Sequence, residues 1–222
     1  LEALVAELSR ASVSSVMKAV PAAAGLSPLA PCRDVARLAR LPPLPQDRGG
    51  VRAVVERLSR VDALRAAGSF DAGLAAAGAA LTAAEAIGWP PLIAAARLRK
   101  GHLLAASGRF PEAGAALEDA YFQASEFGAL EVAATATSLL VYTVGYKQAR
   151  HEEGRRWWRQ TDVLLKVLGV GEDSPLRAHG LSNLALVHDS MGAYAEAREL
   201  HERALAIRER ALGREHPTVA DS

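Results

Sequence analysis

The sequence predicts an all-α fold, an alpha-alpha superhelix in which four helical hairpins stack behind a small helical preamble. Apolar residues recur at the spacing of a single helix face, and no segment shows the alternation with period two that marks a strand. Residues that end helices recur at intervals of 40 to 44, in the range of helical repeats. These markers are Gly68, Gly108, Ala149 and Gly192 for the first helices and Gly88, Gly128, Gly169 and Gly213 for the second helices.

Residues 1–47 form the predicted preamble and its linker. Residues 1–10 have the pattern of a short amphipathic helix, and a second helix over 12–24 is bent or ended by Pro21. A third turn or helix starts at Pro31. The segment LPPLPQDRGG, residues 41–50, contains three prolines and two glycines, so it is predicted to be a linker.

The rest of the chain is predicted to be four repeats, each made of two helices. The repeats are 48–88, 89–128, 129–169 and 170–213, and residues 214–222 begin a truncated fifth repeat. The predicted helix pairs are 49–67 with 70–87, 90–107 with 110–127, 129–148 with 151–168, and 175–191 with 194–212. The last helix shows the pattern most clearly, because its apolar stripe advances by three or four residues at a time. That stripe is Ala197, Leu200, Ala204, Ile207 and Ala211.

Small residues stand at two fixed places in every second helix. Five residues after the first marker come Gly73, Ala113, Gly154 and Ala197, and twelve residues after it come Ala80, Ala120, Thr161 and Ala204. Small side chains let two helices approach closely, so these positions are predicted to be buried at helix contacts. A larger side chain stands two residues after the marker and is predicted to fill the gap between hairpins. It is Phe70, Phe110, His151 or Tyr194.

The last hairpin resembles a known repeat family. Its Leu184-Ala185 pair, followed by Gly192, Tyr194, Ala197 and Ala204, looks like a tetratricopeptide repeat (TPR). The stretch LAIRERALGREHPTVA, residues 205–220, resembles the longer kinesin-light-chain type of about 42 residues, which is common in bacterial signalling proteins. The resemblance implies a TPR superhelix that binds a protein or a peptide.

The preamble adds a second resemblance. Its Ala30, Cys32, Asp34 and Arg37, followed by the PPLP linker and by RHEEG at 150–154, look like the C-terminal region of large bacterial Ser/Thr protein kinases. That resemblance implies the regulatory or sensor segment of a larger signalling kinase. Neither an HRD nor a DFG motif occurs in the sequence, so the segment itself is not expected to be an enzyme. A kinase domain is expected upstream of it.

Composition and charge narrow the classes of partner. Lys and Arg number 26 against 25 for Asp and Glu, so there is no basic excess to attract nucleic acid. The longest uncharged run, 132–146, is too short to cross a bilayer, and no membrane contact is expected of this segment. The single Cys32 allows no internal disulfide. Because the chain starts at Leu1, we expect a fragment of a bacterial protein whose localisation stays open, either cytoplasmic or membrane-anchored.

No group of residues predicts catalysis, a metal site or a cofactor. The six histidines form no HExxH motif, and no cysteine and histidine have zinc-site spacing. Ser182, His188 and Asp189 have the residue types of a hydrolytic triad, but on one helix they point in different directions. Trp158 is predicted to pack in the core, and its neighbour Trp157 to be half exposed.

The remaining candidate site is the concave face, which the first helix of each hairpin lines in a TPR superhelix. Residues off the buried stripe are predicted to face a peptide there: Asp62, Arg65, Arg99, His102, Thr143, Tyr146, Lys147, His179, Ser182, Asn183, Leu186 and Asp189. In peptide-binding TPR proteins an asparagine before the Leu-Ala pair hydrogen-bonds the peptide backbone, and Asn183 matches it. The other units have Ser59, Arg99 and Leu140 there, so no asparagine ladder is present. The alternative is a plain solvated surface.

Protein or peptide recognition is therefore the predicted function, and two other classes stay open. One is the ligand-sensing TPR domain of a transcription regulator, which a closed apolar groove around Leu139 and Tyr146 would favour. The other is a structural or self-association module. Because the helix 194–212 has no complete hairpin after it, a dimer through this uncapped C-terminal repeat is a further possible partnership.

Overall fold

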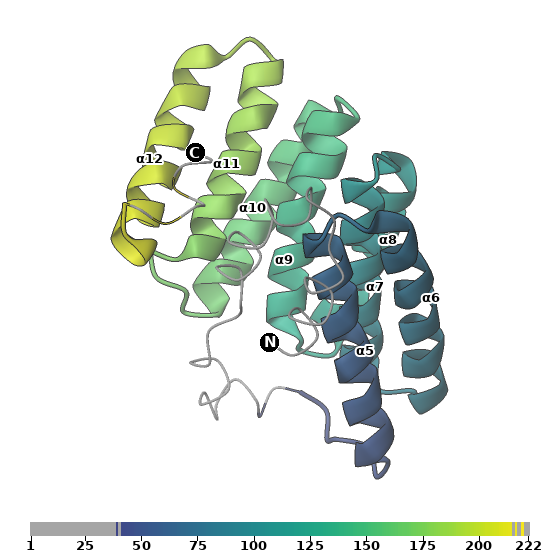
Figure 1. Ribbon diagram of the computed structural model, residues 1–222. Coiled ribbons are helices and arrows are strands. Elements are labelled where there is room, and N and C mark those ends of the chain that lie inside the picture. Colours follow the sequence, from purple (N-terminus) through teal and green to yellow (C-terminus); the bar gives the residue numbers. More distant parts are fainter. Residues whose placement is uncertain (1–38, 40, 215, 217–218, 220–222) are drawn as a thin grey trace.

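The computed structural model describes residues 39, 41–214, 216 and 219, so the predicted preamble helices and nearly all of the fifth repeat lie outside the described residues. Within this part of the chain, every regular element is a helix (Figure 1). The elements are α5 (Arg48–Ala66), α6 (Phe70–Ile87), α7 (Pro90–Ala106), α8 (Phe110–Glu126), α9 (Leu130–Leu140), the π-helix η2 (Val141–Lys147), α10 (His151–Val167), α11 (Pro175–Ser190) and α12 (Tyr194–Leu212). Because η2 continues α9, these elements match the predicted helix pairs.

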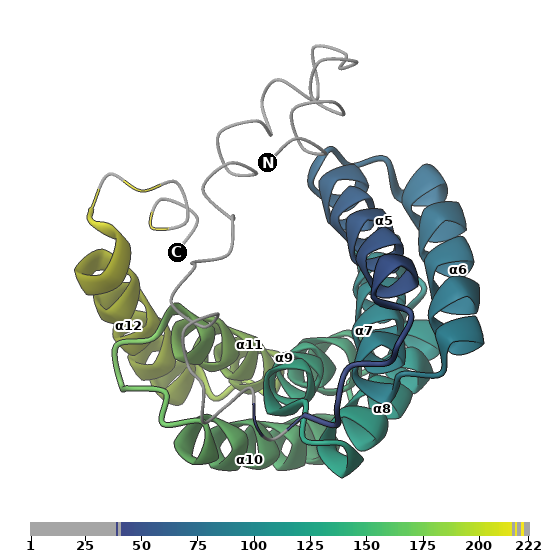
Figure 2. The ribbon, with the colours of Figure 1, turned by 90° about the horizontal axis from the view of Figure 1, so that it is seen from below.

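The described helices form four hairpins that stack in a curved array. Figure 2 shows α5, α7, α9 and α11 along the inner side of the curve, and α6, α8, α10 and α12 along the outer side. Each helix packs mainly on its neighbours in sequence, and the first helices of successive hairpins, such as α5 and α7, also touch. The predicted all-α superhelix is confirmed, and its inner side is the concave face.

The predicted helix-ending markers all have a positive φ. Seven of them are glycines, for which a positive φ brings no clash with a side chain. Gly108, for example, has a φ of 79° after α7. The remaining marker, Ala149, has a φ of 53° and is the described non-glycine residue with a positive φ. The turn after η2 therefore contains a strained alanine.

Ala149→Gly is expected to stabilise the fold. A left-handed alanine costs roughly 1–2 kcal/mol because its Cβ approaches the following carbonyl oxygen. The freedom of glycine in the unfolded chain offsets about 0.5–1 kcal/mol of the gain. We expect the free energy of unfolding to rise by about 0.5–1 kcal/mol in urea denaturation. Gly108→Ala, the opposite change in the equivalent turn, should lower it; equal unfolding of both variants and the wild type would contradict strain at Ala149.

The small residues of the second helices are buried as predicted. Ala80, Ala120, Thr161 and Ala204 have no exposed surface, and Gly73, Ala113, Gly154 and Ala197 are also buried. The larger side chains that stand two residues after the first marker differ in their exposure. Phe70 and Phe110 are half-buried, whereas Tyr194 is 69% exposed, because no described helix packs beyond α12. The prediction that Tyr194 fills a gap is wrong for the described chain, and Ala211 is also exposed at the end of its stripe.

The third hairpin has one residue more in its first helix than the second hairpin has. The markers Gly68 and Gly108, which enclose α7, are 40 residues apart, whereas Gly108 and Ala149, which enclose α9 and η2, are 41 residues apart. Tyr142 is half-buried, like His102 of α7, and Val144 is buried, like Leu103. Thr143, between Tyr142 and Val144, has no counterpart in α7 and is fully buried. Thr143 is thus the inserted residue, and η2 follows from it because i→i+5 hydrogen bonds hold an extra residue in a turn.

Deletion of Thr143 is expected to turn η2 into ordinary α-helix and to leave the fold intact. The residues before and after it keep their repeat positions, and the deletion removes a buried hydroxyl that has no hydrogen-bond partner among the described residues. We expect the free energy of unfolding to change by less than about 1 kcal/mol. Deleting His102 from α7 is the control, since α7 has no extra residue and one of its ends must lose register. Circular dichroism melts compare the two, and equal damage by both deletions would show that Thr143 is not an insertion.

Candidate ligand-binding groove

The concave face contains a cavity of about 330 Å³, which we call the polar cavity. Its lining comes from α7, the α7–α8 turn, α8, α9, η2 and α11 and consists of His102, Ala105, Ala106, Gly108, Phe110, Leu139, Tyr142, Lys147, His179 and Asn183. Four of the predicted site residues, His102, Lys147, His179 and Asn183, therefore meet at one place. The stacking of first helices brings them together, although they are far apart in sequence.

Arginines surround the polar cavity from neighbouring helices. The positive charges of Arg65, on α5, and of Arg99, on α7, both act on His102. Asp62 accepts a hydrogen bond of 2.9 Å from Arg99 Nε and offsets part of this charge. Arg65 Nε is buried and has no hydrogen-bond partner among the described residues. Burial also lowers the pKa of Arg65, which shows that its charged form is poorly solvated. An anionic group of a ligand beside it would stabilise that charged form.

The two histidines of the polar cavity are neutral at pH 7. Burial lowers the pKa of His102 to about 3, and the charge of Arg65 adds to the effect. The His179 ring is open to solvent, but the concave walls displace much of its hydration, and this lowers the pKa of His179 to about 4. The charge of Arg208, from α12, contributes to that shift. Both rings therefore supply hydrogen-bonding groups rather than charge.

Ser138 of α9 fixes two of the groove residues on α11. Asn183 Nδ2 donates to the Ser138 backbone oxygen at 2.8 Å, and His179 Nδ1 lies 3.2 Å from Ser138 Oγ. Asn183 is only 6% exposed, since its amide is engaged inside the array. The predicted open position of Asn183 on the groove surface is wrong, although its side chain reaches the cavity lining. On the same helix, Ser182 Oγ accepts a hydrogen bond of 2.9 Å from Arg208.

Lys147 is held in place by aromatic rings. Its Nζ lies 4.5 Å from the ring centroid of Tyr146, 5.3 Å from that of Tyr142 and 5.8 Å from that of Phe110. Cation–π attraction at these distances contributes about 0.5–1 kcal/mol at exposed sites. Because Lys147 itself is exposed, it presents an oriented positive charge to the groove.

The other predicted groove residues divide by exposure. Thr143 is fully buried, so its predicted place on the groove surface is wrong, and Tyr142 lines the cavity instead. The cause is the π-helix, because an extra residue in the turn changes which side chains face the groove. Tyr146 and Leu186 are half-buried, and Asp189 is exposed. Sequence reasoning missed Tyr142, but the interval of 41 residues was the signal that could have found it.

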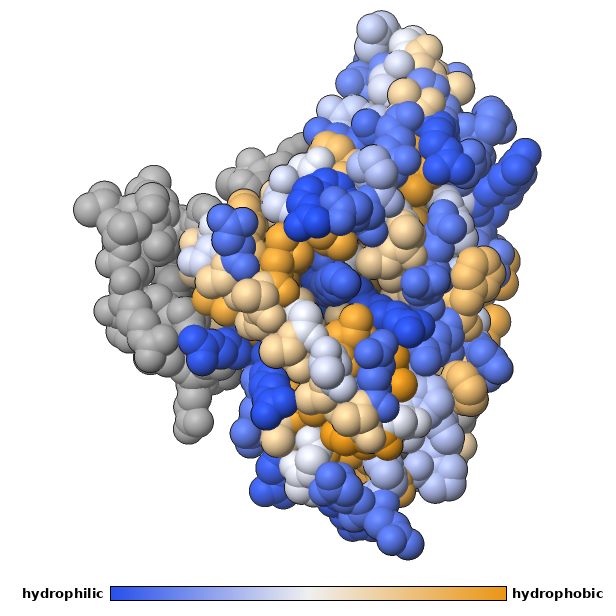
Figure 3. Space-filling view, turned by 90° about the vertical axis from the view of Figure 1, so that its right-hand side faces the viewer, coloured by the Kyte–Doolittle hydropathy of each residue, from blue (hydrophilic) through white to orange (hydrophobic). Residues whose placement is uncertain are grey.

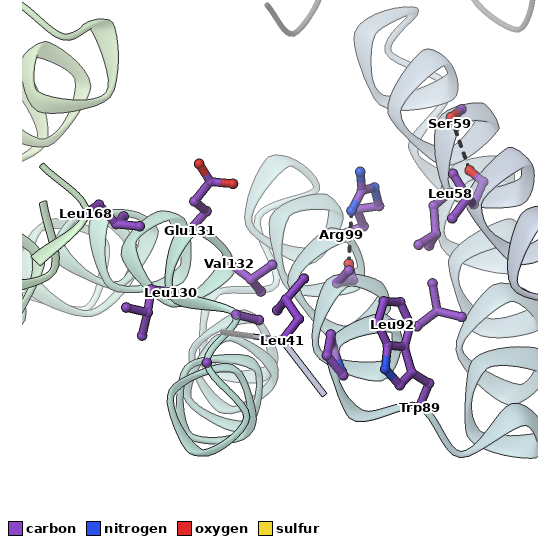
Figure 4. A pocket seen from close by; sticks show the side chains of 15 residues that line it. Leu41, Leu58, Ser59, Trp89, Leu92, Arg99, Leu130, Glu131, Val132 and Leu168 are labelled. Carbon is purple, nitrogen blue, oxygen red and sulfur yellow. Dashed lines mark hydrogen bonds between the residues drawn. The ribbon is translucent and has the colours of Figure 1, made fainter. Parts of the chain in front are cut away.

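A second cavity, the apolar cavity, lies nearer the beginning of α7 and α9 and has a volume of about 300 Å³. Its lining is Leu41, Val55, Leu58, Ser59, Trp89, Pro91, Leu92, Ala95, Arg99, Gly128, Ala129, Leu130, Glu131, Val132 and Leu168. Trp89 Nε1 donates to the Pro42 backbone oxygen at 3.3 Å and so ties the linker to the cavity. In Figure 4 the polar ends of Arg99 and Glu131 extend to one side, while Leu41, Leu92 and Val132 lie below them. Apolar walls therefore meet a charged rim.

The possible metal ligands and the two adjacent tryptophans were the other candidates for a functional role. In the described residues, no group of three or more His, Cys, Asp or Glu is placed to hold a metal ion. Trp158 is half-buried and packs against Gly180, where an added Cβ would collide with its ring. Trp157 is also half-buried, and its ring meets Tyr121 edge-on with centroids 5.3 Å apart. The predicted packing of Trp158 and the partial exposure of Trp157 are confirmed.

One described helix, α6, is long and apolar enough to cross a membrane by the criteria of length and composition alone. Its composition is rich in alanine, and it packs on α5 and α7 within the array. Figure 3 shows hydrophilic residues interspersed with hydrophobic ones over the side of the molecule where α6 lies. The feature is weak evidence for a membrane span, because packed helices meet the same criteria.

Comparison with known proteins adds one positive finding. A search of curated proteins gives no significant match to this chain. Residues 177–218, which include nearly all of the α11–α12 hairpin, match the tetratricopeptide repeat family. This match supports the interpretation of the all-α superhelix as a TPR array.

Proposed function

We propose that the concave face binds an acidic, extended segment of a partner protein. The observation that carries the proposal is the convergence of Arg65, Arg99, Lys147 and Arg208 around the polar cavity. Asp62 offsets Arg99, and the two histidines there are neutral at pH 7. These four cations outnumber Asp62 and the exposed Asp189, so the groove has an excess of positive charge that attracts carboxylates.

The lining favours a peptide over an enclosed small molecule. The cavity beside Leu139 and Tyr142 contains two imidazoles, an amide and an ammonium group. Such groups bind the backbone and side chains of an extended chain, whereas a small-ligand site is mostly apolar with few polar groups. A closed apolar groove at Leu139 would have favoured the ligand sensor.

The test is titration of a fluorescein-labelled octapeptide of Glu and Ser against the protein. We expect binding that weakens as salt rises from about 50 to about 200 mM, because the attraction is between charges. The double variant Arg65→Gln/Lys147→Gln should weaken it by about tenfold, which is about 1.4 kcal/mol. A peptide of Lys and Ser should not bind.

The matched control is Arg159→Gln/Lys166→Gln, which removes two exposed charges from α10 on the outer side of the array. This control variant lowers the net charge of the protein by two, as the groove variant does, and should leave the affinity for the acidic peptide unchanged. Equal weakening by both double variants would show attraction by net charge alone and would overturn the groove as the site.

We further propose that the chain is a regulatory or sensor segment of a larger bacterial Ser/Thr kinase. Support comes from the resemblance of the preamble around Cys32 and Asp34 and of RHEEG at 150–154 to such proteins. Protein interaction in the groove suits a segment that recruits a substrate or a regulator. Sequencing the parent gene upstream tests this, and a DNA-binding domain there in place of a kinase domain would overturn it.

A further inference from the structure

We propose that a groove on the outer side of the array, between α8 and α10, binds an uncharged, proline-rich segment of a partner protein. This aromatic groove has a volume of about 380 Å³ and is lined by Tyr121, Phe122, Glu153, Arg156, Trp157 and Gln160. Because α8 and α10 lie on the outer side of the curve (Figure 2), the site is separate from the concave face. It does not depend on the function proposed for that face.

Three aromatic rings meet in the aromatic groove, although aromatic residues make up only 5% of the chain. The ring centroid of Tyr121, on α8, lies 5.0 Å from that of Phe122 and 5.3 Å from that of Trp157, on α10. Eight residues after the first marker, where Trp157 stands, the other hairpins have Ala76, Ala116 and Leu200. The packing of hairpins therefore requires no aromatic ring at this position.

The rings leave a corner that a ligand can reach. Phe122 is 61% exposed, and Tyr121 and Trp157 are half-buried. The ring planes of Tyr121 and Trp157 stand at 80° to each other. This geometry suits proline, whose compact ring can pack into the angle between two aromatic rings, and aromatic-lined grooves are a recurrent binding mode for PxxP segments.

The free polar groups of the aromatic groove are hydrogen-bond donors. Tyr121 Oη and Trp157 Nε1 form no hydrogen bond with the described residues. The side chains of Arg156 and Gln160 are exposed and are also unpaired within the described chain. All four groups can donate. Proline has a carbonyl oxygen but no N–H, so a proline-rich backbone offers mainly acceptors and complements this lining.

The charges around the aromatic groove are of both signs. Glu153 accepts hydrogen bonds from Arg150 on both carboxylate oxygens, at 2.8 Å from Nε and 2.5 Å from Nη2, so its charge is balanced. Arg156 and Arg159 are exposed and form no ion pair with the described residues. The carboxylates of α8 that stand one turn from Phe122 are Glu118, Asp119 and Glu126. Cations on α10 thus face anions on α8, and neither sign of ligand is favoured over an uncharged segment.

The chain already contains one contact of the proposed kind. Trp89 Nε1 donates to the backbone oxygen of Pro42, the first residue of the PPLP sequence at 42–45. An indole N–H therefore holds a proline-rich segment on the inner side, and Trp157 offers the same donor unused on the outer side. A polyproline II helix is extended and stiff before it binds, so little ordering entropy opposes its association with the groove.

The test is titration of fluorescein-labelled decaproline against the protein, followed by fluorescence anisotropy. We expect saturable binding that changes little between about 50 and about 200 mM salt, because the peptide has no charged side chain. Phe122→Ala should weaken it by about tenfold, since it removes an exposed ring of the groove. Trp157→Phe keeps a ring but removes the N–H donor and should weaken it by about fivefold. Tyr194→Ala, the matched control, removes a 69% exposed ring from α12 and should leave the affinity unchanged.

Two other decapeptides with the same label test the specificity. A peptide of Gly and Ser, which lacks proline rings, should not bind, and a peptide of alternating Phe and Ser should bind more weakly than decaproline. Binding of either one as tight as that of decaproline would overturn proline recognition, and so would a failure of decaproline to bind the wild type. Equal weakening by Phe122→Ala and Tyr194→Ala, with melting curves that verify both folds, would overturn the site.

The variant Arg65→Gln/Lys147→Gln separates this inference from the proposed function. It should weaken binding of the acidic octapeptide and leave decaproline binding unchanged, whereas Phe122→Ala should do the reverse. Loss of decaproline binding in Arg65→Gln/Lys147→Gln would place the peptide on the concave face and would overturn the aromatic groove as its site.

Discussion

Gly154→Ala is expected to lower the free energy of unfolding by about 2–3 kcal/mol. Gly154, at the start of α10, and Gly145, in η2, face each other with their Cα atoms in contact range. A Cβ on Gly154 would overlap Gly145 Cα, and a Cβ on Gly145 would lie 2.7 Å from Gly154 Cα and 2.9 Å from Val187 Cγ2. In both cases the added methyl group meets backbone atoms, which cannot rotate away. The helices η2 and α10 must therefore move apart to accommodate it.

The control for this prediction is Gly78→Ala in α6. A Cβ built on Gly78 meets no atom within 4 Å, and alanine is favoured over glycine inside a helix by about 1 kcal/mol. The same substitution should therefore stabilise at position 78 and destabilise at position 154. Thermal and urea unfolding measure both. A Gly154→Ala variant as stable as the wild type would mean that the η2–α10 contact is looser than its glycines indicate.

This pair of glycines shows what the sequence could predict. The small residue at position 154 was found because repeats at a known interval must place equivalent residues at equivalent contacts. The same regularity gave the ends of the helices, since a residue with a positive φ, which is glycine everywhere except at Ala149, follows each of them. Local rules of this kind act within a few residues, and they repeat four times in this chain.

The groove was predictable only in part, because it depends on register and on contacts between distant residues. His102, Lys147 and His179 were found from the α-helical period. That period fails inside η2, and so Thr143 was placed on the surface and Tyr142 was missed. Arg208 was missed because it belongs to α12, a second helix, and reaches the groove through Ser182.

Contacts between charged residues of different helices could also not be predicted from the sequence. Arg177 stands in the first turn of α11, and no sequence pattern marks it as buried. In the structure it is 4% exposed and donates a hydrogen bond of 2.7 Å to Asp162 of α10. The two residues are fifteen positions apart and lie on different helices. Their contact depends on how α10 and α11 pack, which no local sequence pattern specifies.

Arg177→Met is expected to lower the free energy of unfolding by about 1.5–3 kcal/mol at pH 7, the range for a lost hydrogen bond between charged groups. Methionine keeps most of the apolar stem of arginine but removes the charge that pairs with Asp162 and, at 3.5 Å, with the exposed Glu172. The side chain of Arg177 is nearly fully buried, and that of Asp162 is 27% exposed, so the lost partner is only partly replaced by water. Lys166→Met is the matched control, because Lys166 Nζ also lies 2.7 Å from Asp162 but its side chain is 67% exposed. Its removal should cost less than about 1 kcal/mol.

The pH dependence of this effect separates the ion pair from simple packing. Partial burial alone would raise the pKa of Asp162, but hydrogen bonds from Lys166 and Arg177, together with their charges, lower it below the usual 3.8. A carboxyl group with a lowered pKa in the folded state stabilises the protein fully above its unfolded pKa, and this stability is lost as the pH falls from there through the lower pKa of the folded state. The wild type should therefore lose more stability than Arg177→Met between pH 7 and about pH 2, and the two should converge in acid. A difference between them that stays constant over this range would assign the loss to packing of the Arg177 stem and not to the charge pair.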